Sequence, residues 1–70
     1  MSPNQILVLG TVRAGGPLTA YEISELSGLS LLAVKPRLNE LVKSGVLIAT
    51  GAKINQITGR SNIAYSVAQK

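Results

Sequence analysis

Apolar positions follow a helical period through the middle of the chain, from Thr19 to Leu47. In the second half of this stretch they recur every three or four residues, which predicts one buried stripe on a helix: Leu31, Val34, Leu38, Leu41 and Val42. In the first half, Ile23 and Leu26 predict a shorter helix with an inward face. Two short helices separated by a tight turn, with a strand directly after them, predict a helix-turn-helix.

The ends of these two helices carry their own signals. Thr19 with Glu22 three residues later forms a capping box, in which each side chain satisfies a backbone amide of the first turn. Gly28 ends the first helix, and the hydroxyl of Ser30 can cap the second. Gly45 ends the second helix, because glycine adopts the left-handed conformation found there without strain.

Pro36 lies inside the second predicted helix. Proline in a helix interior removes a hydrogen bond and clashes with the preceding turn, at a cost of about 3 kcal/mol. Two interpretations therefore stay open: the helix begins nearer Ala33, or it bends at Leu32. A late start would place Lys35 and Arg37 in the opening turns.

The segment before this unit predicts another helix, Gln5 to Arg13, with Ile6, Leu9 and either Val12 or Arg13 at helical spacing. Its β-branched residues would equally suit a buried strand. Ser2 and Pro3 can open a helix, because proline has no amide to leave unpaired at the first position. Beyond a breaker of two glycines and Pro17, Leu18 can form a short strand-like contact.

After Gly45 the period changes to alternation, which predicts strands. Val46–Thr50 forms the first, and a second has Ile63, Tyr65 and Val67 on one face with Ala64, Ser66 and Ala68 on the other. Residues 51–62 form a polar loop between them. We expect one α+β domain spanning residues 1–70: three helices followed by a two-stranded β-hairpin.

Charge adds a preference for an anionic partner. Seven Lys and Arg against three Asp and Glu give a net charge of +4, and all three acids fall in predicted helices. Nucleic acid is the leading candidate partner, although a solubilising surface would give the same composition. The longest apolar run is too short to span a bilayer, and no secretory signal is evident, so we expect a cytoplasmic protein without membrane contact.

Residue types needed for most catalysis are absent from the sequence. There is no His, Cys or Asp, so metal ligation and nucleophilic triads lack their essential groups. We therefore expect a protein that is not an enzyme and binds no metal or cofactor.

Three motifs together resemble a known family: xLTAxEIxELxGLS, VxxRLxELxxxGxL, and a Gly-Arg pair before Tyr65. The chain from about Gln5 to Val67 is similar to winged helix-turn-helix DNA-binding domains, such as those of MarR-like regulators and small phage-encoded or prophage-encoded proteins. The resemblance implies that the helix over residues 31–43 enters the major groove of duplex DNA and that the hairpin, as a wing, contacts the backbone or the minor groove.

Site residues follow from that resemblance by position. Arg37 is the first candidate for base readout, because its fork can bond guanine O6 and N7 together. Asn39 could pair with adenine, and Lys35 and Lys43 suit phosphates. The full set of expected DNA contacts is Ser30, Leu32, Ala33, Lys35, Arg37, Asn39 and Lys43 on the helix, with Lys53, Asn55, Gln56 and Arg60 on the wing.

The resulting expectation is a transcriptional regulator that binds duplex DNA in a sequence-specific way, as a homodimer or as adjacent copies. Leu31 and Leu32 depart from the pattern, since related domains carry polar residues there. The alternative is therefore a protein-interaction or replication adaptor module that uses these leucines and the apolar first helix.

Overall fold

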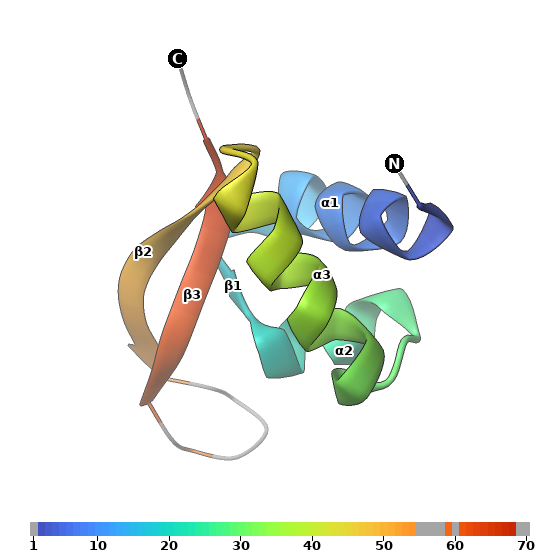
Figure 1. Ribbon diagram of the computed structural model, residues 1–70. Helices are drawn as coiled ribbons and strands as arrows, with labels where there is room; N and C mark the ends of the chain where they lie inside the picture. Colours follow the sequence, from blue (N-terminus) through green and yellow to red (C-terminus); the bar gives the residue numbers. More distant parts are fainter. Residues whose placement is uncertain (1, 55–58, 60, 69–70) are drawn as a thin grey trace.

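The computed structural model describes residues 2–54, 59 and 61–68. In chain order the elements are α1 (Pro3–Gly15), β1 (Leu18–Thr19), α2 (Ala20–Ser27), α3 (Leu31–Lys43), β2 (Leu47–Ile54) and β3 (Ser61–Val67). The three helices gather on one side of a small antiparallel sheet (Figure 1). The expected α+β class and its order of elements are confirmed.

Helix α1 begins earlier and ends later than predicted. Ser2 caps it: the Ser2 hydroxyl accepts from the Gln5 amide at 3.3 Å, and the Ser2 amide donates to the Gln5 side chain at 2.8 Å. Pro3 occupies the first helical position, as its lack of an amide favours. The alternative of a buried strand over residues 5–13 is wrong.

The inward face of α1 is set by Val8 and Val12, which are buried one turn apart. Ile6, which recurs with Leu9 at helical spacing, does not face inward: its side chain is 57% exposed. At about 100° per residue, Ile6 lies about 200° around the helix from Val8. Leu9 is partly buried against the core, as its spacing predicted.

Helix α2 starts on the predicted capping box. The Glu22 amide donates to the Thr19 hydroxyl at 3.3 Å, and the Thr19 amide donates to Glu22 Oε1 at 2.9 Å. Gly28 ends the helix at a φ of 79°. In this two-turn helix only Ile23 is buried, so the inward placement of Leu26 is wrong: it is 64% exposed and faces a groove beside α1.

Helix α3 has the predicted bounds, 31–43, and begins at Ser30, whose hydroxyl accepts from the Ala33 amide at 3.3 Å. Pro36 is therefore in the interior, and the interpretation that the helix starts nearer Ala33 is wrong. Lacking an amide, Pro36 cannot donate to the carbonyl of Leu32. Most of the predicted stripe is confirmed, with Val34, Leu38 and Leu41 buried and Val42 packed against them, whereas Leu31 stays half-exposed.

The sheet has three strands in the order β1-β3-β2, where a two-stranded hairpin was predicted. The third strand is the short contact expected at Leu18, which pairs with Tyr65. Both hairpin strands are longer than predicted, because residues of the expected loop continue the ladder as far as Ile54 and Ser61. A bulge at Thr50 interrupts it, and Gly51 there adopts a φ of 111°.

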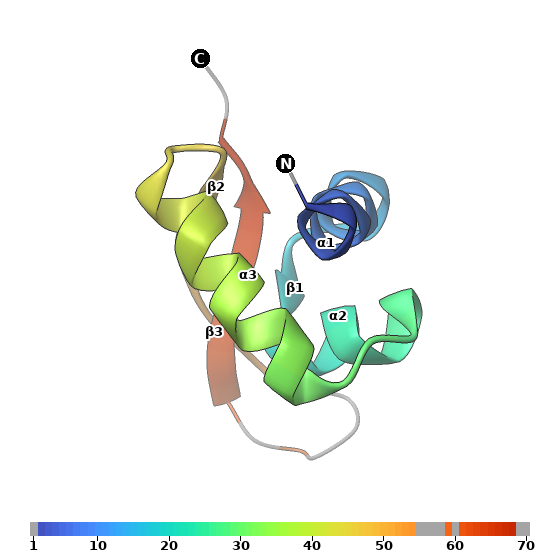
Figure 2. The ribbon, with the colours of Figure 1, turned by 45° about the vertical axis from the view of Figure 1, so that its right-hand side comes forward.

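The core fills the space between the helices and the sheet. Figure 2, in which α1 is seen end-on, shows α3 in front of the hairpin strands. Tyr65 and Val67 of β3 pack against the core, whereas Ile63, predicted on the same face, is 54% exposed. The buried cluster is Val8, Val12, Leu18, Ile23, Val34, Leu38, Leu41 and Leu47.

Within the described residues, no helix is long and apolar enough to cross a membrane. The same residues contain no cluster of three or more side chains of the kinds that hold metal ions.

Candidate nucleic-acid interface

Helix α3 presents one side fully to solvent. The exposed residues of α3 are Leu32, Lys35, Pro36, Asn39, Glu40 and Lys43. Five of them fall within about 100° around the helix axis, on a face that we call the outward face: Leu32, Lys35, Pro36, Asn39 and Lys43. Over residues 31–43, all of which the structure describes, Glu40 is the single acid, and it lies on the flank toward α1. The outward face therefore carries two lysines and an apolar residue at its first turn, with the exposed Glu40 at its edge.

Arg37 lies to one side of this face and is held by its own helix. Its Nη2 donates to Glu40 Oε2 at 2.9 Å, and its buried Nε lies 2.8 Å from Oε1 without the angle of a hydrogen bond. The same Oε1 accepts from Gln5 of α1 at 2.8 Å. Base readout by Arg37 stays a prediction, and it would require the guanidinium to leave Glu40 first.

Lys35 lies on the opposite flank of α3, toward α2 and β3. Its ammonium is 6.0 Å from the centre of the Tyr21 ring, within the range of a cation–π contact. Residues two positions apart in a helix lie about 200° apart around its axis, so the side chains of Lys35 and Arg37 leave α3 on nearly opposite sides. The residues that the sequence motif grouped together are thus divided between two flanks.

Lys53, predicted as a wing contact, links the hairpin to the start of α2. Its ammonium lies 3.1 Å from Glu22 Oε1 and donates to the Pro17 carbonyl at 2.8 Å. Burial by itself would raise the pKa of Glu22, but the hydrogen bond from the Thr19 amide and the nearby Lys53 outweigh it and hold that pKa below its ordinary value. The Lys53 ammonium is therefore already engaged by two oxygen atoms of the fold.

The other predicted contacts divide into two groups. Ser30 and Ala33 lie at the first turn of α3, beside the outward face, with the Ser30 hydroxyl engaged in the cap. Asn55, Gln56 and Arg60 lie outside the described residues.

A cleft of about 330 Å³ separates α2 and α3 from strand β3. It is lined by Ala20, Tyr21, Lys35, Ser61, Asn62, Ile63 and Tyr65. Lys35 of α3 therefore shares this cleft with the start of β3, at Ser61, Asn62 and Ile63. Sequence reasoning missed Tyr21, Ser61 and Asn62, because the prediction assigned Ser61 and Asn62 to a loop and gave Tyr21 no role in a site.

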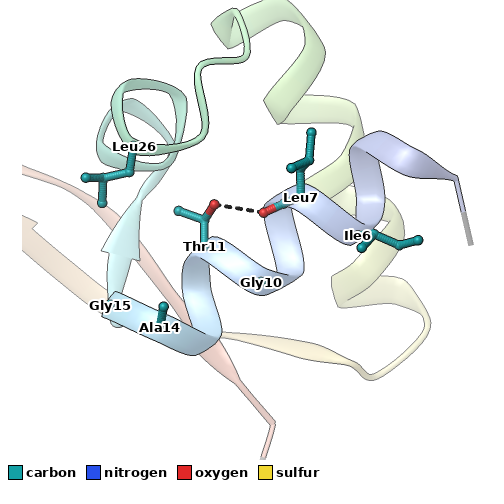
Figure 3. Close-up of a pocket in the computed structure, with 7 residues that line it drawn as sticks. All are labelled: Ile6, Leu7, Gly10, Thr11, Ala14, Gly15 and Leu26. Carbon is teal, nitrogen blue, oxygen red and sulfur yellow. Dashed lines mark hydrogen bonds between the residues drawn. The ribbon is translucent and has the colours of Figure 1, made fainter.

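A second, more apolar groove of about 520 Å³ lies on the outer side of α1. Figure 3 shows Ile6 and Leu7 at one end of the α1 face, Ala14 and Gly15 at the other, and Leu26 projecting from α2. The Thr11 hydroxyl is turned back onto the Leu7 carbonyl at 2.8 Å, so it offers its proton to the helix and not to the groove. This groove is separate from the cleft.

Helix, short strand, helix-turn-helix and hairpin, in this order and with the hairpin beside the second helix of the motif, define a winged-helix fold. Among solved structures, the crystal structure of ScpB from Mycobacterium tuberculosis is similar, with a TM-score of 0.74 over 97% of this chain. The two sequences are 18% identical, so the likeness concerns the fold. The chain spans about 38% of the length of that structure.

No protein-family model and no curated protein sequence matches the chain. The narrower resemblance to MarR-like regulators and phage-encoded proteins therefore remains a prediction.

Proposed function

We propose that this winged-helix domain binds duplex DNA, with the outward face of α3 in the major groove and the wing against the backbone or minor groove. We further propose that it acts as a transcriptional regulator and that it is a binding module without catalytic activity. The sequence supports the last point, because it contains no His, Cys or Asp.

One observation carries the proposal: the outward face of α3 has two exposed lysines, and the single acid of residues 31–43, Glu40, lies at its edge and is paired with Arg37. Lys35 and Lys43 are exposed there, and Asn39 between them is exposed as well. Lysines suit phosphates, and an asparagine side chain can bond adenine N6 and N7. The three carboxylates of the sequence lie elsewhere: Glu22 beside Lys53, Glu25 on α2, and Glu40 beside Arg37.

The ion pairs within the fold set the expected strength of binding. Because Arg37 and Lys53 are already paired, Lys35 and Lys43 are the cations that α3 offers to DNA. Arg60, which the sequence predicts as a wing contact, would add a third. Three phosphate contacts predict a log–log salt slope near about −3, at about 0.9 per contact. Such binding is weak, which favours two adjacent copies or a homodimer on the DNA.

The test is a fluorescence-anisotropy titration of a labelled duplex of mixed sequence at several salt concentrations. We expect binding at low salt that weakens with the slope above. Lys43→Glu should weaken binding at least tenfold, because it places an acid against a phosphate.

The matched control is Arg13→Glu, the same charge change on the last turn of α1, away from the outward face. It should lower the affinity no more than about threefold, through net charge alone. A folded wild-type domain that does not bind duplexes even in dilute buffer would refute the proposal, as would equal effects of the two substitutions.

A second candidate function, a protein-interaction module, is favoured by Leu32. This side chain is 88% exposed at the first turn of α3, and the α1 groove adds Ile6 and Leu7 as exposed apolar residues. For this candidate the partner we test is a second copy of the chain. Sedimentation equilibrium of the wild type should then show a dimer that Leu32→Asp or Leu7→Lys dissociates, and a monomer at all concentrations would argue against it.

A further inference from the structure

The cleft between the helix-turn-helix and the wing contains a cation, two small polar side chains and an exposed apolar one. Lys35 supplies the charge, and Ser61 and Asn62 supply the hydroxyl and the amide at the start of β3. Ile63 follows them and is half-exposed on a strand whose neighbour Ala64 is buried. The Ile63 side chain is not part of the buried core cluster, so core packing does not explain an apolar residue at this position.

We propose that this cleft binds one sugar-phosphate unit of the DNA backbone, so that a strand is held between α3 and β3. In this assignment, which rests on the proposed function, Lys35 and Ser61 contact the phosphate and Ile63 packs against the deoxyribose. Phosphate and sugar contacts of this kind fix the register of a protein on a duplex without reading its sequence.

Tyr21 explains why Lys35 is directed toward the cleft. The Lys35 ammonium lies 6.0 Å from the centre of the Tyr21 ring, and both residues line the cleft. A lysine side chain in solvent samples many rotamers. Contact with the aromatic face restricts these rotamers before binding, so less side-chain entropy is lost when Lys35 binds a phosphate. Tyr21 is thus a positioning residue for the Lys35 charge.

Charge around the cleft is compatible with an anion. The lining residues, all of them described, include Lys35 and no carboxylate. The nearest acid in sequence to Tyr21, Glu22, is hydrogen-bonded to the Thr19 amide and lies beside the Lys53 ammonium, which neutralises it. A phosphate entering the cleft would therefore meet the cation with no carboxylate in the lining, while the exposed Glu25 lies outside the lining, one turn after Tyr21 on α2.

The first test introduces an acid into the cleft. Ser61→Glu should weaken binding of the labelled duplex at least tenfold at about 100 mM salt, because a carboxylate there would repel the phosphate. Asn4→Glu is the matched control, since it adds the same charge near the start of α1 and should change affinity no more than about threefold. Ser61 is exposed, so the fold should survive, which circular dichroism checks.

The second test removes the cation. Lys35→Gln should lower the salt slope by about 0.9, the value of one phosphate contact, whereas Arg13→Gln should leave the slope unchanged. Tyr21→Leu should weaken binding about threefold and Tyr21→Phe should restore it, because phenylalanine retains the ring face.

The outcomes separate this inference from the proposed function. A wild-type domain that binds no duplex refutes both. A wild-type domain that binds, with Ser61→Glu equal to Asn4→Glu and an unchanged slope for Lys35→Gln, refutes the cleft and leaves DNA binding by α3 intact.

Discussion

The ammonium of Lys53 on the hairpin lies 3.1 Å from the carboxylate of Glu22 on the first turn of α2. The same carboxylate accepts from the Thr19 amide, and the same ammonium donates to the Pro17 carbonyl. One ion pair thus ties the wing to the start of the helix-turn-helix. It also makes the wing's position sensitive to the protonation of one acid.

Glu22 should make the fold acid-sensitive. Its pKa in the folded state lies below the ordinary value of 4.5, so the unfolded chain binds the proton more readily and protonation favours unfolding. The stabilisation is present above about pH 4.5 and is lost as the pH falls through the lowered pKa. We expect Glu22→Gln to cost about 1 kcal/mol at pH 7 and to flatten the pH dependence in urea titrations. Unchanged acid sensitivity in this variant would contradict the assignment.

Arg37 should contribute little to DNA affinity, because its guanidinium is engaged with Glu40. We expect Arg37→Gln to change the dissociation constant of the labelled duplex less than twofold, and Lys43→Gln to raise it about fivefold under the same conditions. A loss of tenfold or more from Arg37→Gln would instead support base readout by this residue.

Pro36 should lower the stability of α3. Alanine at this position restores an amide that can donate to the Leu32 carbonyl and removes the clash of the ring, which together stabilise a helix by up to about 3 kcal/mol. Alanine also gives the unfolded chain more conformational entropy than proline does, which offsets part of this gain. We therefore expect Pro36→Ala to raise the free energy of unfolding by about 1–2 kcal/mol. Urea denaturation measures this, and a less stable variant would be the contrary result.

Gly16 is required by a close approach of two backbone segments. A Cβ there would lie 2.6 Å from the Val12 carbonyl oxygen, while the φ of −69° is open to any residue. We expect Gly16→Ala to destabilise the domain by about 1–3 kcal/mol in thermal unfolding. Gly10→Ala is the control, because nothing lies within 4 Å of its added Cβ and alanine is the better helix former, so it should stabilise.

Local signals of the sequence predicted the helices well. Capping at Thr19 and Ser30 depends on residues three positions away, and both caps form as expected. The wrong burial assignment of Leu26 and the exposure of Ile6 both depend on how α1 and α2 pack against each other. A helical period shows that a face exists, whereas the choice of face on a weakly amphipathic helix is made by tertiary contacts.

The candidate site was less predictable than the fold. Which lysines are available depends on ion pairs between distant segments, and nothing local to Lys53 indicates that it lies beside Glu22. The cleft likewise required the register of β3, which brings Ser61 and Asn62 beside Lys35. Among the described residues, position on α3 did predict the exposure of Asn39 and Lys43.

The order of the strands determines whether a fragment of the chain can stay folded by itself. The last strand, β3, is central, and it alone joins β1 to β2 in the sheet. Leu18 near one end of the chain is thereby paired with Tyr65 near the other. Removing β3 would expose both remaining strands together with the core residues beneath them, so neither half should persist independently, and unfolding should occur in one cooperative step.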